Sequence, residues 1–326
     1  MIILIHVHSP FAIWNIPASH VARLREQFPS HEFVVSTDDG AGLRLIPQAE
    51  VAFSSQITRE QFVAAPRLRW IHSPSVGIGG MLFPELLASP VVLTNSRGMA
   101  ADTMAEHVLA VTLALFRRLP LAWRSQAARE WAQDAIGLAG TRTISGSRVL
   151  VVGLGAIGTA VATRMAALGA EVIGIRRRDE APRPAAVARV GTPAQLLELL
   201  PSADVVVISA PHTRETRCLI GARELSAMSR DAILVNVSRG QLIDEHALAG
   251  ALAEKRIAAA ALDVFNDEPL PPESPFWTLP DVLITPHTSG FRPDHWDAAI
   301  ALFAENLRRF EAGRPLLNVV DKQAGY

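Results

Sequence analysis

Short runs of β-branched and other apolar residues alternate with segments of helical periodicity along most of the chain. Alternation of this kind is typical of βαβ units and a parallel sheet. A helix such as Val21–Phe28 fits between two of the runs. In the first third, five runs are expected to form strands of one small α/β domain: Ile2–Val7, Glu32–Ser36, Val51–Ser54, Leu68–His72 and Val91–Thr94.

A long helix and then a second α/β unit are predicted next. Apolar residues recur at helical spacing from Asp102 to the residue before Pro120. The six strands expected after it are Arg148–Gly153, Glu171–Ile175, Asp204–Ser209, Ala232–Asn236, Ala258–Asp263 and Val282–Thr285. The helices expected among them include Ile157–Leu168, Pro193–Leu200, Ala222–Ala227 and Glu245–Glu254, while 184–190 is expected to be a surface loop. This count is that of a Rossmann domain.

The last predicted helix, Pro293–Ala312, follows the final strand and is expected to cross back to the first domain. The sequence therefore predicts an α/β fold of two Rossmann-like, doubly wound parallel-sheet domains. A dinucleotide-binding domain at 99–290 would be inserted into a flavodoxin-like substrate domain formed by 1–98 and 291–326.

Composition narrows the class of protein. The chain has 326 residues, of which 49% are hydrophobic and 19% charged, with a net charge of −1. That balance favours a folded protein and argues against nucleic acid or a membrane surface as the main partner. The single cysteine, Cys218, excludes an intramolecular disulfide framework. The apolar start, Met1–Val7, has no basic segment or cleavage site of a signal peptide. A cytoplasmic protein is expected.

A glycine-rich turn opens the second unit. Its residues match G-x-G-x-x-G, directly after a buried strand and directly before a helix, and they are Gly153, Leu154, Gly155, Ala156, Ile157 and Gly158. In that context the first glycine permits a tight turn, and the second lets the backbone approach a pyrophosphate. The helix N-terminus adds free N–H groups for the phosphates. The motif predicts a dinucleotide site, and a purely structural turn is the weaker interpretation.

Basic residues end the next strand, where a site for NAD usually has Asp or Glu. The run is Arg176, Arg177 and Arg178, and no carboxylate precedes Asp179. Arginine can pair with a 2′-phosphate, whereas a carboxylate would repel it. A preference for NADP(H) is expected, with NAD(H) still possible. The alternative is a solvated basic loop.

Three polar segments follow successive predicted strands. They are N-V-S-R-G at 236–240, D-V-F-N-D-E-P at 263–269 and P-H-T-S-G at 286–290. Open α/β sheets bind ligands at the carboxyl ends of their strands. The three segments are therefore expected to form one site beside the glycine turn.

Together these motifs resemble the D-isomer-specific 2-hydroxyacid dehydrogenase family, in its glyoxylate/hydroxypyruvate reductase-like branch. The resemblance covers nearly the whole chain. It includes N-S-R-G…A-E-H-V-L-A at 95–110, the glycine turn, and the stretch from Ala210-Pro211 to Glu215-Thr216-Arg217. The family fold, a nicotinamide cofactor and a homodimer are what the resemblance implies, with the region Trp123–Ile136 as the arm between subunits.

The resemblance also implies a catalytic set. Arg239 would hold the substrate carboxylate, because a guanidinium is always charged and forks onto a carboxylate. His287 would be the acid/base, and Glu268 would hydrogen-bond its far nitrogen and favour the protonated ring. Backbone N–H groups at Val76, Gly77 and Ile78 would meet the same carboxylate.

Further cofactor contacts are implied by resemblance at Ala210, Pro211, Thr216, Val237, Ser238, Asp263, His287 and Ser289. At the start of the long helix, many relatives carry a hydroxyl residue that touches the cofactor. Met104 stands at that position, with Thr103 beside it, so a contact there is in doubt.

His6 and His8 share one face of the first strand, but two histidines make no metal site without a third ligand, and none is evident. No metal is expected. The function predicted is an NADPH-dependent reductase of small 2-keto acids, or equally a D-2-hydroxyacid dehydrogenase. The alternatives are a phosphite or other small-anion dehydrogenase on the same fold, and a non-enzymatic, dinucleotide-sensing corepressor-like protein.

Overall fold

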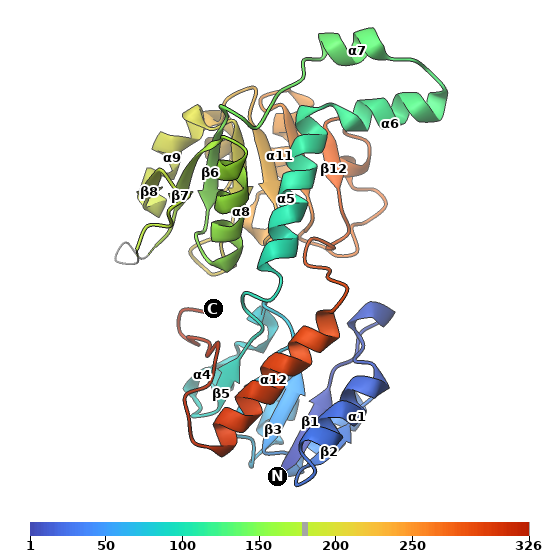
Figure 1. The fold of residues 1–326 in the computed structure, drawn as a ribbon, viewed down its shortest axis with the longest axis vertical. Helices are drawn as coiled ribbons and strands as arrows, with labels where there is room; N and C mark the ends of the chain where they lie inside the picture. The colour runs from blue at the N-terminus through green and yellow to red at the C-terminus, as the bar shows by residue number, and fades with distance from the viewer. Residues whose placement is uncertain (178–181, 326) are drawn as a thin grey trace. The chain divides into compact units, whose positions relative to one another are not determined.

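The computed structural model describes residues 1–177 and 182–325. Two α/β units each contain one parallel sheet, which confirms the predicted fold class (Figure 1). Unit 1 comprises Met1–Met99 and the segment from Arg292 onward, and unit 2 comprises Ala100–Phe291. Arg178 and Asp179, which entered the argument on the cofactor, lie outside the described residues.

The sheet of unit 1 has the strand order β2-β1-β3-β4-β5, all parallel. This is the flavodoxin-like order, as predicted. The strands are β1 (Ile2–His6), β2 (Glu32–Val35), β3 (Val51–Ser54), β4 (Trp70–His72) and β5 (Val92–Thr94). The α-helices are α1 (Ala18–Gln27), α2 (Asp39–Leu45), α3 (Arg59–Val63), α4 (Pro84–Ala88) and α12 (His295–Glu311), with 3-10 turns η1 (Ala12–Trp14), η2 (Ile46–Gln48) and η3 (Gly79–Met81).

Helix α12 lies on this sheet, far from it in sequence (Figure 1). Phe303 and Leu307 are fully buried on its inner face. The ring of Phe303 contacts Phe53 at 4.8 Å and Trp70 at 5.2 Å between centroids. Burying such aromatic side chains is worth about 1.5–3 kcal/mol each. The apolar stripe of the last predicted helix therefore belongs to the core of unit 1, as expected.

The sheet of unit 2 has the order β12-β11-β10-β9-β6-β7-β8, again all parallel. It contains the Rossmann order extended by one strand. The strands are β6 (Arg148–Val152), β7 (Glu171–Ile175), β8 (Arg189–Gly191), β9 (Val205–Ile208), β10 (Ile233–Asn236), β11 (Ala259–Leu262) and β12 (Val282–Ile284).

Helices cover this sheet on both faces, and two apolar clusters lie beneath them. The α-helices are α5 (Ala101–Phe116), α6 (Leu119–Ala128), α7 (Gln133–Leu138), α8 (Ala156–Ala167), α9 (Leu196–Leu199), α10 (Ala222–Ala227) and α11 (Glu245–Ala253). The 3-10 turns are η4 (Pro193–Gln195), η5 (Leu200–Ser202), η6 (Gly240–Leu242) and η7 (Pro275–Trp277). Buried strands with continuous apolar runs are what a sheet covered on both faces requires.

Two elements differ from the prediction. The segment 184–190, expected to be a loop, runs into strand β8 at the edge of the sheet. Val190 of β8 pairs with Gly174 of β7. Its start was missed because an Ala/Pro/Arg-rich segment does not look like a strand. The long helix ends at Phe116 rather than just before Pro120, because Arg118 adopts a left-handed φ of 57°. Pro120 then falls in the first turn of α6, where proline is well tolerated.

Among the described residues, none of the helices combines the length and apolar character needed to cross a bilayer.

Candidate active site

The candidate residues of unit 2 follow the carboxyl ends of neighbouring parallel strands. Gly153 follows β6, Arg239 comes after β10, and His287 comes after β12. Because these strands run in one direction, their carboxyl ends share one edge of the sheet. The order reverses between β6 and β9, so the glycine turn lies at the switch point where such sheets bind ligands.

The glycine turn has the geometry that close packing and phosphate binding require. Gly153 has φ +104°, and a Cβ there would lie 2.6 Å from the backbone nitrogen of Ala210. A Cβ on Gly158 would lie 1.9 Å from the carbonyl oxygen of Gly153. A Cβ on Gly155, which caps α8, would meet nothing within 4 Å. Packing thus demands glycine at the outer two positions, and the open face at Gly155 fits a pyrophosphate at the helix N-terminus.

Hydroxyl groups fix the loops around this turn. Ser209 donates a hydrogen bond to the Gly153 carbonyl at 2.8 Å, a contact that sequence reasoning missed. Ser238 donates to the carbonyl of Ala210, which joins the loops after β9 and β10. Thr216 donates to the carbonyl of Pro211 at 2.7 Å. Ser238 and Thr216 are therefore held within the protein's own loops, and Val237 is buried beside them.

Arg176 and Arg177 lie at the end of β7. The guanidinium of Arg176 donates a hydrogen bond to the carbonyl of Pro182 at 3.1 Å. Its backbone N–H donates to the carbonyl of Gly191 in β8. Arg177 forms an ion pair with Glu215 at 3.0 Å. Leu154 of the glycine turn lies over Gly174 of the same strand, where a Cβ would be 2.3 Å from the leucine side chain. The structure therefore places a guanidinium immediately after the strand that neighbours the glycine turn.

His287 and Glu268 form a close pair. The Nδ1 atom of His287 lies 2.6 Å from Oε2 of Glu268, and both side chains are partly exposed. The other carboxylate oxygen, Oε1, accepts the backbone N–H of Phe265 at 2.9 Å. Glu268 therefore fixes which ring nitrogen of His287 faces the protein and leaves Nε2 for other partners.

Opposing effects act on the pKa of Glu268. Burial alone would raise it, but the hydrogen bonds from His287 and Phe265 lower it, as do the positive charges of His287 and Arg239. The net result is a pKa below the usual value for glutamate. The side chain is thus an anion at neutral pH, which is the state that can hold a protonated imidazole.

Arg239 is placed by the loop that follows β10. Asn236 organises this loop, because its side chain donates to the Arg239 carbonyl at 2.9 Å and accepts the Ser238 N–H at 3.0 Å. A Cβ on Gly240 would lie 2.0 Å from the backbone of Phe265, so glycine lets the loops after β10 and β11 meet. Burial lowers the pKa of Arg239 and the charge of Glu268 raises it. Arginine remains a cation under these conditions.

Asp263 is buried and anchors the loop that carries His287. Its carboxylate accepts the hydroxyl of Thr285 at 2.6 Å and the backbone N–H groups of Thr288 at 2.9 Å and Ser289 at 3.0 Å. His107 of α5 contacts Thr285 at 3.2 Å. The sequence did not single out Thr285 or His107 for this role. In the structure, Asp263 and the Ser289 backbone organise the loop.

The remaining candidates lie elsewhere. Val76, Gly77 and Ile78 belong to unit 1, where Asn95 donates to the Val76 carbonyl at 2.9 Å and Ile78 is buried. Met104 of α5 packs against the apolar core of unit 2. Thr103 donates its hydroxyl to the Ala100 carbonyl at 3.1 Å, a bond within its own helix.

The sequence and structure are similar to those of 2-hydroxyacid dehydrogenases and keto-acid reductases. The sequence profile of the family described as "D-isomer specific 2-hydroxyacid dehydrogenase, NAD binding domain" matches residues 109–289. A glyoxylate reductase of Korarchaeum cryptofilum is 34% identical over 82% of this chain and 80% of its own. A D-3-phosphoglycerate dehydrogenase of Mycobacterium bovis is 34% identical over 95% of this chain, which spans only 58% of that relative.

One similar solved structure is an NADPH-dependent glyoxylate/hydroxypyruvate reductase from Sinorhizobium meliloti in complex with NADP and sulfate. It is 26% identical, with a TM-score of 0.85 over 100% of this chain and 99% of that one.

The family profile and the relatives show an NAD(P)-dependent oxidoreductase that acts on the CH–OH group of 2-hydroxy acids. The chain belongs to the D-isomer-specific 2-hydroxyacid dehydrogenase family. Its similarity to glyoxylate and hydroxypyruvate reductases confirms the branch that the motifs indicated.

Proposed function

We propose that this protein is an NADPH-dependent reductase of small 2-keto acids such as glyoxylate or hydroxypyruvate. The observation that carries the proposal is the 2.6 Å pair of His287 and Glu268, which lies on the same strand-end edge as Arg239 and the glycine turn. An acid/base, its anionic partner and a fixed cation are the groups that reduction of a keto acid requires.

Each side chain has a distinct task in this mechanism. Arg239 binds the substrate carboxylate and polarises the C2 carbonyl, because its guanidinium can donate two parallel hydrogen bonds. The reduced nicotinamide, when bound, supplies a hydride to C2. His287 delivers the proton from Nε2 to the carbonyl oxygen, which becomes the hydroxyl group. Glu268 holds Nδ1–H throughout and stabilises the imidazolium before the transfer. In the oxidative direction His287 accepts that proton.

The NADPH preference is supported by Arg176, which occupies the position after β7 where a carboxylate would otherwise receive the ribose hydroxyls. Arg177 would add to the positive charge around a 2′-phosphate. The Sinorhizobium meliloti reductase described above was solved with NADP, and another solved structure, from Xanthobacter autotrophicus, is a complex with NADPH.

Val76, Gly77 and Ile78 of unit 1 are proposed as further substrate-binding residues, because backbone N–H groups can donate to a carboxylate. The exposed Gly77 leaves the backbone accessible to a small anion. For the cofactor, the further contacts proposed are Leu154, Ala156, Ile157, Ala210, Pro211, Thr216, Val237, Ser238, Asp263 and Ser289. Asp263 and Ser289 would act from the anchored loop, near the nicotinamide end.

Steady-state oxidation of NADPH and NADH over a panel of 2-keto acids tests the function. The panel contains glyoxylate, hydroxypyruvate and pyruvate, with D-3-phosphoglycerate and phosphite assayed in the oxidative direction. We expect kcat/KM to be highest for a small keto acid with NADPH. Phosphite oxidation without keto-acid reduction would instead indicate a small-anion dehydrogenase, and tight NADPH binding without any turnover would indicate a sensing protein.

The cofactor assignment predicts the effect of Arg176→Asp. The variant should lose at least about tenfold in kcat/KM for NADPH, because a bidentate, charge-assisted contact is replaced by repulsion. NADH should be affected much less, since it lacks the 2′-phosphate. Arg183→Asp is the matched control, because it changes a nearby arginine that bonds the carbonyl of Ala188 within its own segment. Equal losses with both cofactors in Arg176→Asp would show that the 2′-phosphate lies elsewhere.

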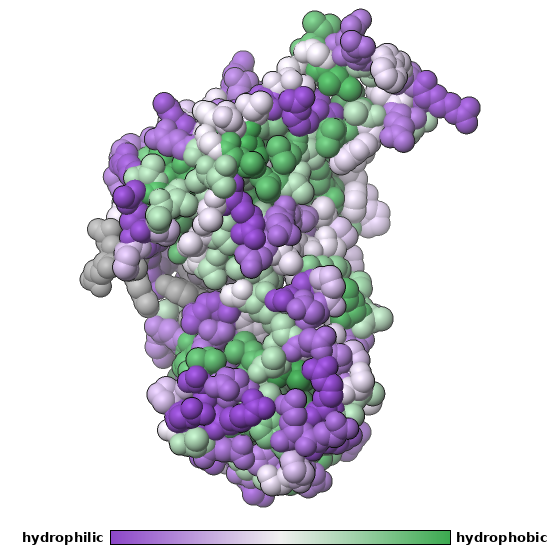
Figure 2. Space-filling view, viewed as in Figure 1, coloured by the Kyte–Doolittle hydropathy of each residue, from purple (hydrophilic) through white to green (hydrophobic). Residues whose placement is uncertain are grey.

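We further propose that the protein is a cytoplasmic homodimer with α6 and α7 at its interface. These helices project from the body of unit 2 (Figure 1), and Figure 2 shows hydrophobic side chains among the hydrophilic ones on this segment. Trp131 is 91% exposed and Leu138 90% exposed. Large apolar side chains left in water on a projecting segment are typical of protein–protein contacts.

A further inference from the structure

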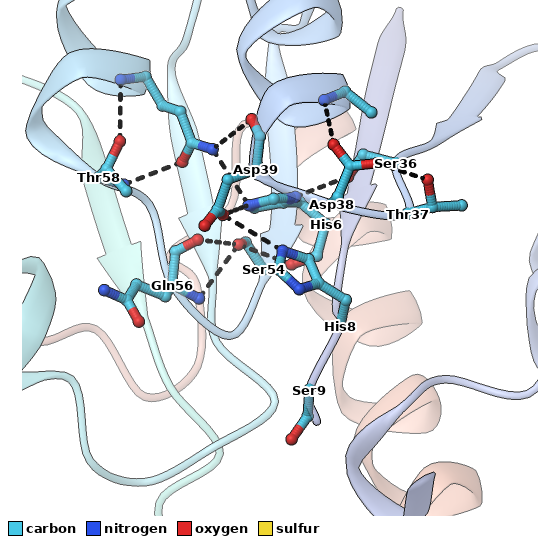
Figure 3. Close-up of polar contacts among 12 residues, drawn as sticks. His6, His8, Ser9, Ser36, Thr37, Asp38, Asp39, Ser54, Gln56 and Thr58 are labelled. Carbon is cyan, nitrogen blue, oxygen red and sulfur yellow. Dashed lines mark hydrogen bonds and ion pairs between the residues drawn. The ribbon is translucent and has the colours of Figure 1, made fainter. Parts of the chain in front are cut away.

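Two histidines and a carboxylate meet at the carboxyl end of β1 in unit 1 (Figure 3). His6 ends β1, His8 lies two residues on, and Asp39 is the first residue of α2. The Nε2 atoms of both histidines approach the same oxygen, Oδ1 of Asp39, at 3.4 and 3.2 Å. The candidate ligand atoms of the three residues all lie within 4.8 Å of one another.

The third ligand could not be found from the sequence, because Asp39 lies 31 residues after His8. The parallel pairing of β1 with β2 brings the segment after β2 beside the end of β1. Gly42 lets α2 approach closely, since a Cβ there would lie 2.7 Å from Cε1 of His6. The fold thus builds the cluster from the end of β1, the residues just after it and the start of α2, at one edge of the sheet.

Two of the three separations among the candidate ligand atoms match a transition-metal site. Zinc binds imidazole nitrogen and carboxylate oxygen at about 2.0–2.1 Å in tetrahedral geometry, which sets its ligand atoms about 3.3–3.4 Å apart. The two nitrogen–oxygen distances, 3.4 and 3.2 Å, are close to that separation. All three atoms lie within 4.8 Å of one another, so a shift of the partly exposed His8 would complete the spacing around an ion.

The contacts of His6 fit a tautomer with the ring proton on Nδ1. The side-chain oxygen of Gln61 accepts the Thr58 N–H at 2.9 Å, so its amide nitrogen is the group that faces Nε2 of His6, at 3.3 Å. An amide nitrogen can only donate, and in this tautomer Nε2 accepts from it. Nδ1 then donates to Oγ of Ser36, which lies 2.6 Å away.

In this tautomer Nε2 of His6 and Oδ1 of Asp39 are both hydrogen-bond acceptors, 3.4 Å apart. A cation bound between them would remove their repulsion. Asp39 forms no ion pair with lysine or arginine within the described parts of the chain, 1–177 and 182–325. Fixing one ring nitrogen through a bond from the other is the usual support of a metal-bound histidine. Here Ser36 provides it.

We propose that His6, His8 and Asp39 bind one divalent transition-metal ion of the Zn²⁺ class. Two imidazoles and one carboxylate suit zinc, cobalt or nickel, whereas Mg²⁺ and Ca²⁺ prefer oxygen ligands alone. On binding, Gln61 gives up its contact with Nε2 and keeps its bond to the Asp39 carbonyl at 3.2 Å. His6 is 2% exposed, His8 33% and Asp39 69%, so the ion enters from solvent and water completes its coordination.

The full-length protein, treated with chelator and then dialysed, is titrated with Co²⁺ by visible absorption and then with Zn²⁺ in competition. We expect one Co²⁺ per chain with d–d absorption, displaced by one Zn²⁺. His8→Ala and Asp39→Ala should each weaken binding at least about tenfold, as losses of a ligand do. Both side chains are partly exposed, so the variants should fold, which circular dichroism checks.

His20→Ala is the matched control. His20 also faces a carboxylate, Asp297, at 3.3 Å, but its site includes Arg23 and no second histidine. Metal affinity in this variant should equal that of the wild type. The pair of His287 and Glu268 is another place where an ion could bind, so His287→Ala is titrated as well. The proposal is overturned if His8→Ala and Asp39→Ala bind as tightly as the wild type, if only His287→Ala loses binding, or if no equivalent binds.

Discussion

His287→Ala is expected to lower kcat for keto-acid reduction by about 10²- to 10⁴-fold, the usual contribution of a positioned acid/base. The variant removes the proposed proton donor, while the glycine turn and the loops after β9 and β10 should stay intact. The dissociation constant of NADPH should therefore change little. Stopped-flow reduction of glyoxylate, with NADPH binding measured separately by fluorescence, separates the two effects.

His212→Ala is a matched control, because it removes an exposed histidine that follows Pro211 after β9. Its kcat should stay near that of the wild type. If His287→Ala retained kcat within a few-fold of wild type, another group would have to supply the proton, and the proposed catalytic set would be wrong.

Arg239→Ala is expected to reduce kcat/KM for 2-keto acids by about 10²- to 10³-fold, as the loss of a charged hydrogen-bond donor at a reacting oxygen commonly does. The substrate would lose both a partner for its carboxylate and the polarisation of its carbonyl. KM should rise and kcat should fall, and steady-state assays over a wide range of keto-acid concentration resolve the two.

Arg239→Lys helps to distinguish charge from geometry. Lysine keeps the positive charge but cannot form two parallel hydrogen bonds, so it should recover only part of the loss. Thermal melting shows whether either variant disturbs the loop that Asn236 and Gly240 hold. A well-folded Arg239→Ala protein with unchanged kinetics would assign the carboxylate to another residue.

Strand positions in both sheets could be predicted from the sequence, because buried parallel strands are continuous apolar runs such as Val205–Ile208. Strand β8 could not, since it is short, lies at the sheet edge and needs only one partner. The early end of α5 depends on the left-handed backbone of Arg118, which is a conformation that apolar spacing does not encode.

Candidate site residues such as Arg239 and His287 could be predicted from the sequence, because a charged or titratable residue directly follows a predicted strand. The contacts that hold these residues in place could not be predicted. Ser209, Thr285 and His107 are common residues without a motif, and only the fold brings them to the loops that they hold. Asp39 was missed for the same reason, because strand pairing rather than spacing sets it beside His6 and His8.

The backbone of His287 has φ +54°, a conformation that costs a non-glycine residue about 1–3 kcal/mol. Hydrogen bonds from the neighbouring backbone to buried Asp263 hold it there. This conformational free energy is offset when unit 2 folds, and it does not have to be supplied again in each catalytic cycle. If His287 is the acid/base as proposed, a substrate would meet an imidazole whose backbone is already fixed, and less binding free energy would be needed to orient it.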